Sequence, residues 1–406
     1  MKKQESKTKK KQAGIKKLKR RVITFFSIEF CDTLYLDDLA EQGCIFENAF
    51  PGGNWTMPSH ASMLTGLDTT SHTIWSWSHR FPQGTETAFD LFHRAGYEVG
   101  CFAITQLRDL FSGTPADHFG DSDDAGVIRC IESSKPFFVF WHTYNVHYPY
   151  GMVLPNDYDD SQTDYDHPSR TLNYLRSLII GGRTELIKDS YRREIQRVAR
   201  FVGRVAAKLK KLGKFERTYF IITADHGEAW EPYTTFHCNF KEEVLRVPLF
   251  ISGPGIPQTR VGATVSQVDL LPTVLQLCEI DASDRAEAFD GGSLVPAMNE
   301  VLNACHPIVI AGPDGVRVRH RYIAIRNGEW MLITALNHWA ESFHRIAPDG
   351  LSSNLLDRPM VREGSSALEE FRAMAERHTE RFLSNRDNVV ELSIGTQKKL
   401  QALGYV

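Results

Sequence analysis

Residues 217–228 read RTYFIITADHGE, an apolar and β-branched run that ends in the polar residues Asp225, His226 and Glu228. A short apolar run bounded by a turn is typical of a strand buried on both faces, as in parallel sheets covered by helices. Open α/β sheets place their ligand sites at the carboxyl ends of such strands. We therefore expect a functional site at Asp225 and His226.

Other apolar runs alternate with helical segments on both sides of this stretch. The runs are VITFFSIEF (22–30), EVGCFAIT (98–105), PFFVFWHTY (136–144) and VPLFISGPG (247–255). Helical patterns cover about 86–95 and about 185–212, and Gly96 and Gly213 follow them as expected of residues just past a helix end. The alternation predicts an α/β sandwich, with a mostly parallel mixed sheet flanked by helices.

The pattern changes from about residue 312 onward. RYIAIRNGEWMLITA (321–335) predicts two strands joined by a turn at Asn327 and Gly328, SFHRIAPDG (342–350) predicts a further strand, and a helix is expected at about 366–383. We therefore predict three parts: a basic arm at 1–21, a catalytic α/β domain at 22–311 and a smaller α+β subdomain at 312–406.

Charge is distributed unevenly along the 406 residues. Residues 1–21 hold eleven Lys and Arg against one acid, a net of +10, so the chain's net charge of −3 leaves −13 for the rest. Such an arm is expected to be disordered and solvated, with at most weak contact to an anionic surface. The whole chain is 42% hydrophobic and 24% charged, which is ordinary for a folded protein, and the part after residue 21 lacks the basic patches interleaved with aromatic residues that would indicate a nucleic-acid partner.

The cysteines and the apolar runs of the sequence indicate in which cellular compartment the protein is expected. The seven cysteines are scattered without a C-x-x-C pair, which indicates neither a disulfide framework nor a structural zinc site and slightly favours the cytoplasm. We expect no transmembrane segment, because no apolar run approaches the roughly 20 residues that a spanning helix needs. The basic residues of the arm and the apolar run at 22–31 together resemble a signal peptide. However, Glu29 interrupts the apolar run, and no small-residue cleavage site follows it.

Residues 54–66, NWTMPSHASMLTG, predict a short helix that begins near Thr56. Thr56 stands in a capping position, Pro58 near the first turn and Gly66 just past the end. A helix start offers unpaired N–H groups and partial positive charge, which suits phosphate or sulfate. The alternative is a capped surface helix without ligand. Asp225 and His226, natural ligands of Zn²⁺ or Mn²⁺, favour the anion site.

These motifs resemble the sulfatase family of the alkaline-phosphatase-like superfamily. TMPSHASMLTG (56–66) is similar to the family's signature, [C/S/T]-x-P-S-[R/H]-x-x-x-x-T-G, and further matches follow in the family's order. They are KPFF (135–138) with HYPY (147–150), DHGE (225–228) with EEVLRVPL (242–249), VDLLPT (268–273), FDGGSL (289–294) and LGY (403–405). The resemblance implies the alkaline-phosphatase-like fold and a hydrolase or transferase of sulfate or phosphate esters.

The resemblance also assigns roles to residues. Thr56 stands where sulfatases carry a Cys or Ser that is oxidised to formylglycine; a Thr cannot be converted, so direct attack by its oxygen is implied. That attack needs one divalent metal ion (Ca, Mn, Mg or Zn), for which Thr56, Asp225 and His226 are implied ligands. His60 replaces the family's Arg, and His147 matches a substrate-contacting His. His237 stands where relatives keep a Lys or His that protonates the leaving oxygen.

One segment departs from the family pattern. Relatives carry metal-binding carboxylates at the end of the first strand, followed by a loop of roughly fifteen residues that is absent here; Asp32 is therefore the expected ligand and Glu29 its alternative. Should neither reach the site, the chain would be a catalytically impaired pseudoenzyme. The expected substrate is a small-molecule or a glycan- or lipid-linked ester. The aromatic and His residues expected to line its pocket or else the core are Trp75, Trp77, His79, Trp141 and Tyr144.

Overall fold

The structure is a computed structural model of the 406-residue chain. It describes residues 21–26, 34–121, 124–155, 170–231, 236–282, 288–299, 307–312, 321–336, 340–347, 350–351 and 365–385. The basic arm therefore lies outside the described residues except for Arg21, which already forms part of the first strand.

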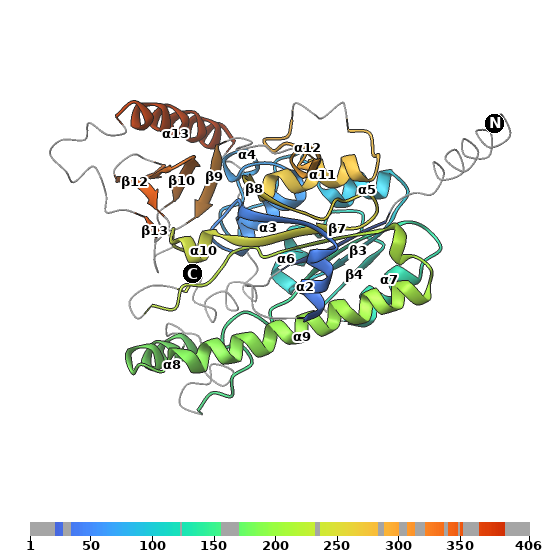
Figure 1. Ribbon diagram of the computed structural model, residues 1–406. Helices are drawn as coiled ribbons and strands as arrows, with labels where there is room; N and C mark the ends of the chain where they lie inside the picture. The colour runs from blue at the N-terminus through green and yellow to red at the C-terminus, as the bar shows by residue number, and fades with distance from the viewer. Residues whose placement is uncertain are drawn as a thin grey trace.

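An eight-stranded sheet forms the centre of the molecule (Figure 1). Its strands, in spatial order, are β4 (His118–Gly120), β3 (Glu98–Phe102), β5 (Phe137–His142), β1 (Arg21–Phe26), β6 (Thr218–Thr223), β7 (Val247–Ser252), β2 (Gly43–Phe50) and β8 (Thr259–Ser266). β7 is antiparallel to both of its neighbours, and all other neighbours pair in parallel. The predicted mixed, mostly parallel sheet is confirmed.

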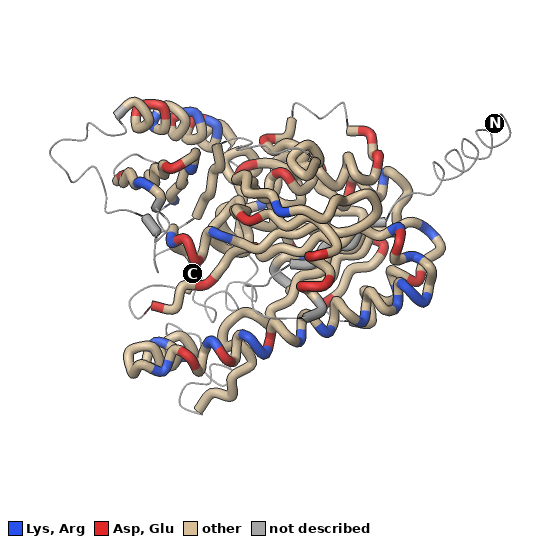
Figure 2. Tube along the Cα trace, in the orientation of Figure 1, with Lys and Arg blue, Asp and Glu red and all other residues tan. Residues whose placement is uncertain are grey.

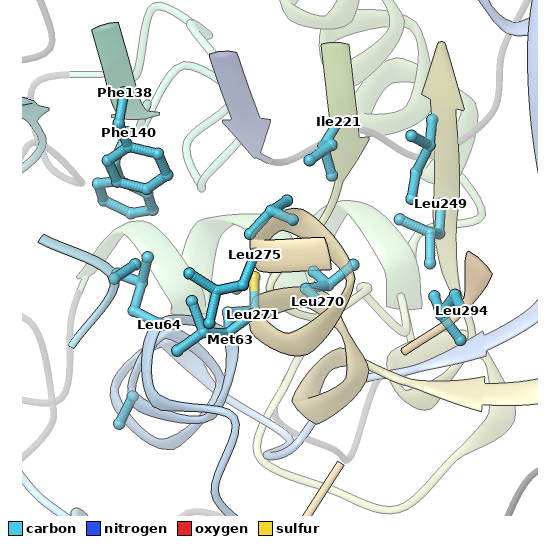
Figure 3. Close-up of a cluster of buried hydrophobic side chains, with 14 of the residues drawn as sticks. Met63, Leu64, Phe138, Phe140, Ile221, Leu249, Leu270, Leu271, Leu275 and Leu294 are labelled. Atoms are coloured by element: carbon cyan, nitrogen blue, oxygen red, sulfur yellow. The ribbon is translucent and has the colours of Figure 1, made fainter. Parts of the chain in front are cut away.

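Alternate residues of the central strands face opposite helical layers, because successive side chains of a strand point to opposite faces. On β6, Tyr219 and Ile221 join one apolar cluster, whereas Phe220 and Ile222 join another. The first cluster packs against α3 (Thr56–Thr65), α5 (Ala88–Arg94) and α11 (Leu270–Leu277). Figure 3 shows this cluster, in which side chains of α3 and α11 meet those of the central strands.

The second cluster lies on the other face of the sheet. It packs against α2 (Leu34–Glu41), α7 (Asp124–Glu132), α8 (Arg170–Ile180) and the long α9 (Thr184–Lys211). The long helix ends as its sequence predicts, with Gly213 in the left-handed region at φ 63°. The remaining short helices are α4 (Thr69–His72), α6 (Thr105–Leu110), α10 (Glu242–Leu245), α12 (Val295–Asn299) and the 3₁₀ turns η3 (Phe215–Arg217) and η4 (Gln267–Asp269).

A second, five-stranded sheet carries the C-terminal part. Its order is β13 (Gly350–Leu351), β12 (Glu341–Ala347), β11 (Trp330–Ala335), β10 (Tyr322–Asn327) and β9 (Ile308–Gly312), and α13 (Ser365–Asn385) packs on it. The hairpin at Asn327 and Gly328 forms as predicted, with Gly328 at φ 57°. β9 pairs with β10, so this sheet begins at Ile308, before the predicted domain boundary at residue 312.

Five described cysteines are buried and form no disulfide bond within the described part of the chain: Cys44, Cys101, Cys130, Cys238 and Cys278. Burial raises the thiol pKa values of Cys44, Cys101, Cys130 and Cys238, that of Cys44 to about 12, so these four thiols stay protonated near neutral pH. Among the described residues, every helix is too short or too polar to span a lipid bilayer.

Candidate active site

The helix α3 begins at Thr56, and its whole length is buried. Trp55, rather than Thr56, is the N-cap residue, and no side chain caps the helix; the predicted capping position is therefore corrected by one residue. The Thr56 hydroxyl is thus not used for capping, and Oγ1 lies 3.5 Å from Nε2 of His226. Gly66 ends the helix in the left-handed region at φ 70°, as predicted.

His60 lies one turn further along α3 and is completely buried. Its Nδ1 lies 2.7 Å from the carbonyl oxygen of Thr56 and 3.7 Å from Oδ2 of Asp225. Because a carbonyl only accepts, Nδ1 carries the hydrogen in this contact. Helix periodicity thus places His60 beside Thr56 and turns its ring toward the end of β6.

Asp225 and His226 follow β6 at its carboxyl end, where the sequence places them. Oδ2 of Asp225 lies 3.5 Å from Nε2 of His226. Burial alone would raise the pKa of Asp225, but charge interactions with His226, His60 and His142 outweigh burial and lower it. Asp225 is therefore a buried carboxylate among imidazoles, a donor set suited to a divalent cation.

His142 is a fourth member of this group that the sequence motifs do not single out. It ends β5, and its ring centroid lies 4.6 Å from that of His60. Burial lowers the pKa of His142 to about 3, so the imidazole is neutral. Ligand atoms of His60, His142 and Asp225 all lie within 4.8 Å of one another. The available signal was its place at the carboxyl end of an apolar run, the same signal that identified Asp225.

His237 lies beside His226, and His147 lies beside His237. The ring centroid of His237 is 4.6 Å from that of His226 and 5.6 Å from that of His147. Burial lowers the pKa of His147 to about 4. Nδ1 of His237 lies 3.1 Å from Oε1 of Glu228, a second buried carboxylate that sequence reasoning assigned no role. The four predicted histidines (His60, His147, His226 and His237) and Thr56 therefore lie in one region.

A pocket opens at the centre of these residues. It is lined by Thr56, His142, Thr143, Tyr144, Val146, His147, Tyr191, Asp225, His226 and Glu228. Among the five residues considered for a substrate pocket, Tyr144 lines it, while Trp75, Trp77 and Trp141 belong to apolar clusters. His79 is buried and bonds to the Ser76 hydroxyl, with 2.6 Å between Nδ1 and Oγ.

Asp32 and Glu29 lie outside the described residues. The strand that precedes them, β1, ends at Phe26, whose backbone pairs with His142 on β5 and Thr223 on β6. The end of β1 thus lies between the two strands that carry His142 and Asp225. A carboxylate, two or more imidazoles and a hydroxyl are the ligand types that divalent transition metals accept, so the described donors fit such an ion.

Comparisons of the sequence with known proteins agree on one protein family. The sulfatase family profile matches residues 24–124 and 125–280. A Delta 4,5-hexuronate-2-O-sulfatase of Bacteroides thetaiotaomicron is 25% identical over 355 residues, which cover 72% of this chain and 72% of that protein. An arylsulfatase K of Gallus gallus is 28% identical over 376 residues, which cover 75% of this chain and 70% of that protein.

Solved structures share the fold. A 2-O GAG sulfatase has a TM-score of 0.71 at 20% identity, over 94% of this chain and 96% of that one. A phosphonate monoester hydrolase from Silicibacter pomeroyi has a TM-score of 0.65 at 16% identity, over 90% and 95% of the two chains. The predicted alkaline-phosphatase-like architecture is confirmed, and because the family profile matches more than half of its residues, the chain belongs to the sulfatase family.

Proposed function

We propose that this sulfatase-family ester hydrolase acts on sulfate esters at the pocket beside α3, with Oγ1 of Thr56 as the attacking atom. One observation carries the proposal. The Thr56 hydroxyl lies at the buried start of a helix, 3.5 Å from Nε2 of His226, and Thr56 lines the same pocket as Asp225. The N–H groups of the helix start are suited to hold the negatively charged sulfate during attack.

A divalent metal ion would be held by Asp225 and His226, together with Thr56 and Asp32. When bound, it lowers the pKa of a coordinated hydroxyl and stabilises charge on the ester. His142 and His60 lie close enough to Asp225 to support the same set. Glu29 is the alternative to Asp32, because both follow β1 in the sequence.

The chemistry divides into two steps. The Thr56 hydroxyl loses its proton to solvent, and Oγ1 attacks sulfur in line while the bond from sulfur to the alcohol oxygen breaks. His237 gives a proton to that oxygen, with His147 as the alternative donor. Water then attacks the Thr56 sulfate ester, His237 takes back a proton from this water, and sulfate leaves with Oγ1 restored.

The activities of the relatives suggest which esters this protein hydrolyses. Their names include a hexuronate 2-O-sulfatase and arylsulfatases, so a sulfated sugar or an aryl sulfate is the first choice. Tyr144 and His147 line the pocket and offer an aromatic face and a polar ring for such a group. Phosphate esters are the second candidate, because a Thr nucleophile attacks directly rather than as an aldehyde hydrate, as in relatives that act on phosphate esters.

A substrate panel tests the proposal. Aryl sulfates, sulfated sugars, phosphate monoesters, phosphodiesters and phosphonates are assayed with and without Ca²⁺, Mn²⁺ or Zn²⁺. Thr56→Val, which has the shape of Thr without the hydroxyl, is expected to lose turnover by about 10³-fold or more, whereas Thr56→Ser retains measurable turnover. Full activity in folded Thr56→Val protein would exclude Thr56 as the nucleophile.

A non-catalytic reading of the site is the alternative. A pseudoenzyme with an incomplete metal site would bind sulfate in the pocket without turnover and without stoichiometric metal. Isothermal titration with Mn²⁺ and Zn²⁺ separates the two readings, because the enzyme is expected to bind metal in a defined ratio. The absence of both turnover and metal binding in folded protein would favour the pseudoenzyme.

We further propose that the basic arm makes a weak contact with an anionic surface. β1 follows the arm, and its Arg21 pairs with Thr218, close along the chain to the end of α9. That end exposes Lys210 and Lys211, and Figure 2 shows further Lys and Arg along the helix. Binding to vesicles containing an anionic phospholipid should fall with added salt and with deletion of residues 1–20. Salt-independent binding would contradict this contact.

A further inference from the structure

Glu228 joins two parts of the structure that meet beside the pocket. Its Oε1 lies 3.1 Å from Nδ1 of His237, and its Oε2 accepts a hydrogen bond of 3.2 Å from the Tyr150 hydroxyl. Glu228 follows β6, whereas Tyr150 belongs to the segment after β5. Each carboxylate oxygen therefore has a defined donor from a different segment.

Tyr150 is itself held in place. The indole N–H of Trp230 donates a hydrogen bond of 3.1 Å to the Tyr150 oxygen, and the rings of Tyr150 and Tyr191 meet edge to face at 5.4 Å. Glu228 is 5% exposed, His237 5% and Tyr150 1%. A buried chain of hydrogen bonds thus runs from Trp230 through Tyr150 and Glu228 to His237, and water has little access to exchange with it.

The contact between Glu228 and His237 determines where the hydrogen of the His237 ring lies, because Oε1 of Glu228 faces Nδ1. A carboxylate only accepts hydrogen bonds, so the ring nitrogen that faces Glu228 must carry a hydrogen. The hydrogen bond therefore selects the form of His237 with hydrogen on Nδ1.

We propose that Glu228 is the positioning residue of His237: it holds the Nδ1 hydrogen of the ring and thereby makes Nε2 the nitrogen that exchanges a proton with the leaving oxygen. This inference rests on the proposed function. In the first step the sulfur–oxygen bond breaks, its electron pair stays on the alcohol oxygen, and the Nε2 proton transfers to it. In the second step Nε2 takes a proton from the attacking water. Nδ1 keeps its hydrogen throughout.

A second role for the same residues is a metal site. Ligand atoms of His226, Glu228 and His237 lie within 4.8 Å of one another. The positioning role is favoured because both oxygens of Glu228 are engaged by hydrogen-bond donors, His237 and Tyr150, and Trp230 in turn donates to Tyr150. Metal stoichiometry separates the two roles and forms part of the test.

The kinetic test uses the leaving group as the readout. A general acid matters most for a poorly departing alcohol and least for an activated phenol, so the loss caused by Glu228→Ala should depend on the alcohol. We expect about a 100-fold loss of kcat/KM for an alkyl or sugar sulfate and less than about tenfold for 4-nitrophenyl sulfate. Glu228→Gln keeps an acceptor oxygen and should recover part of the loss. Equal losses on both substrates would overturn the proposal.

A matched control lies in the same segment. Glu231 forms an ion pair with Lys241, so Glu231→Gln removes a charge from the same segment while leaving the carboxylate that is bonded to His237, and it should leave both substrates unaffected. A leaving-group dependence as large in Glu231→Gln as in Glu228→Ala would also overturn the assignment. This control separates a specific effect on His237 from a general change of the segment's charge.

A spectroscopic test does not depend on turnover. In metal-free protein with ¹⁵N-labelled histidine, the His237 signals, identified by their loss in His237→Gln, should show hydrogen on Nδ1 in the neutral ring. Glu228→Ala should shift the population toward hydrogen on Nε2, and Glu228→Gln should retain the wild-type form. An unchanged spectrum in Glu228→Ala overturns the inference, whereas the proposed function fails only if the wild-type chain hydrolyses no ester. A second equivalent of Zn²⁺ that binds wild type and not Glu228→Ala would assign the residues to metal instead.

Discussion

The backbone N–H of Asn54 donates a hydrogen bond of 3.1 Å to the carbonyl oxygen of Ala311. Ala311 belongs to β9 at the edge of the second sheet, and its own N–H donates to the carbonyl of Gly52. The carbonyl of Asn54 in turn accepts from the N–H of Cys238, next to His237. The C-terminal sheet therefore fixes the loop that leads into Thr56 and connects it to the segment of His237.

Substitution of Gly312 tests this connection. A Cβ at Gly312 would lie 1.7 Å from Oδ1 of the buried Asn54, so Gly312→Ala must displace the loop before Thr56. We expect a loss of about 1–3 kcal/mol in the free energy of unfolding, measured by urea denaturation, together with a lower kcat. Gly262→Ala on β8 is the control, because its nearest contact is 3.8 Å away. Equal effects of the two substitutions would contradict the connection.

The apolar runs predicted most of the central sheet and the hairpin at Gly328, because alternation and turn residues act locally. β2 (Gly43–Phe50) was not predicted. It carries Glu47 and Asn48, and its pairing shifts register between Phe46 and Ala49, so no regular period marks it. The antiparallel direction of β7 is likewise a property of the topology and not of its own residues.

The candidate site likewise contains residues that local sequence predicts and residues that only the tertiary structure brings in. Thr56, His60, Asp225 and His226 were predictable because each stands in a local motif or at a strand end, and the structure brings them together. His142 also ends an apolar run, but it joins them because β5 and β6 flank the same strand, an adjacency that local sequence does not encode. The contact of Glu228 with His237 likewise accompanies a hydrogen bond from the N–H of Ala229 to the carbonyl oxygen of Phe236, a pairing that local sequence does not encode.

Metal binding tests the ligand assignment at the end of β1. Asp225→Asn should lower the affinity for Mn²⁺ or Zn²⁺ by at least about 10-fold to 100-fold, because it removes the negative ligand of the described group. If Asp32 supplies the second carboxylate, Asp32→Asn has a comparable effect and Glu29→Gln does not. Titration calorimetry measures each variant against wild type. Unchanged affinity in Asp32→Asn with a loss in Glu29→Gln would transfer the role to Glu29.

Three histidines away from the pocket, His72 and His79 buried and His378 half-buried, predict how stability depends on pH. Burial lowers the pKa of His72 to about 3, while burial together with nearby arginine charges lowers the pKa values of His79 and His378 to about 4. His72 also accepts the N–H of Ile74 at Nδ1, with 3.0 Å between the nitrogens, so protonation there would break this hydrogen bond.

These folded-state pKa values lie below the unfolded value of about 6.5, so the unfolded chain binds more protons as the pH falls. Stability from these groups is complete above about pH 6.5 and is lost progressively toward pH 4, by up to about 1.4 kcal/mol per pH unit for each histidine. The free energy of unfolding, measured by urea denaturation between pH 7.5 and 4.5, should fall with this slope. In His72→Gln the slope should be smaller by the amount that corresponds to about one proton taken up on unfolding. His93→Gln, at an exposed position on α5, is the control. A His72→Gln profile parallel to that of wild type would show that His72 is not a source of the acid sensitivity.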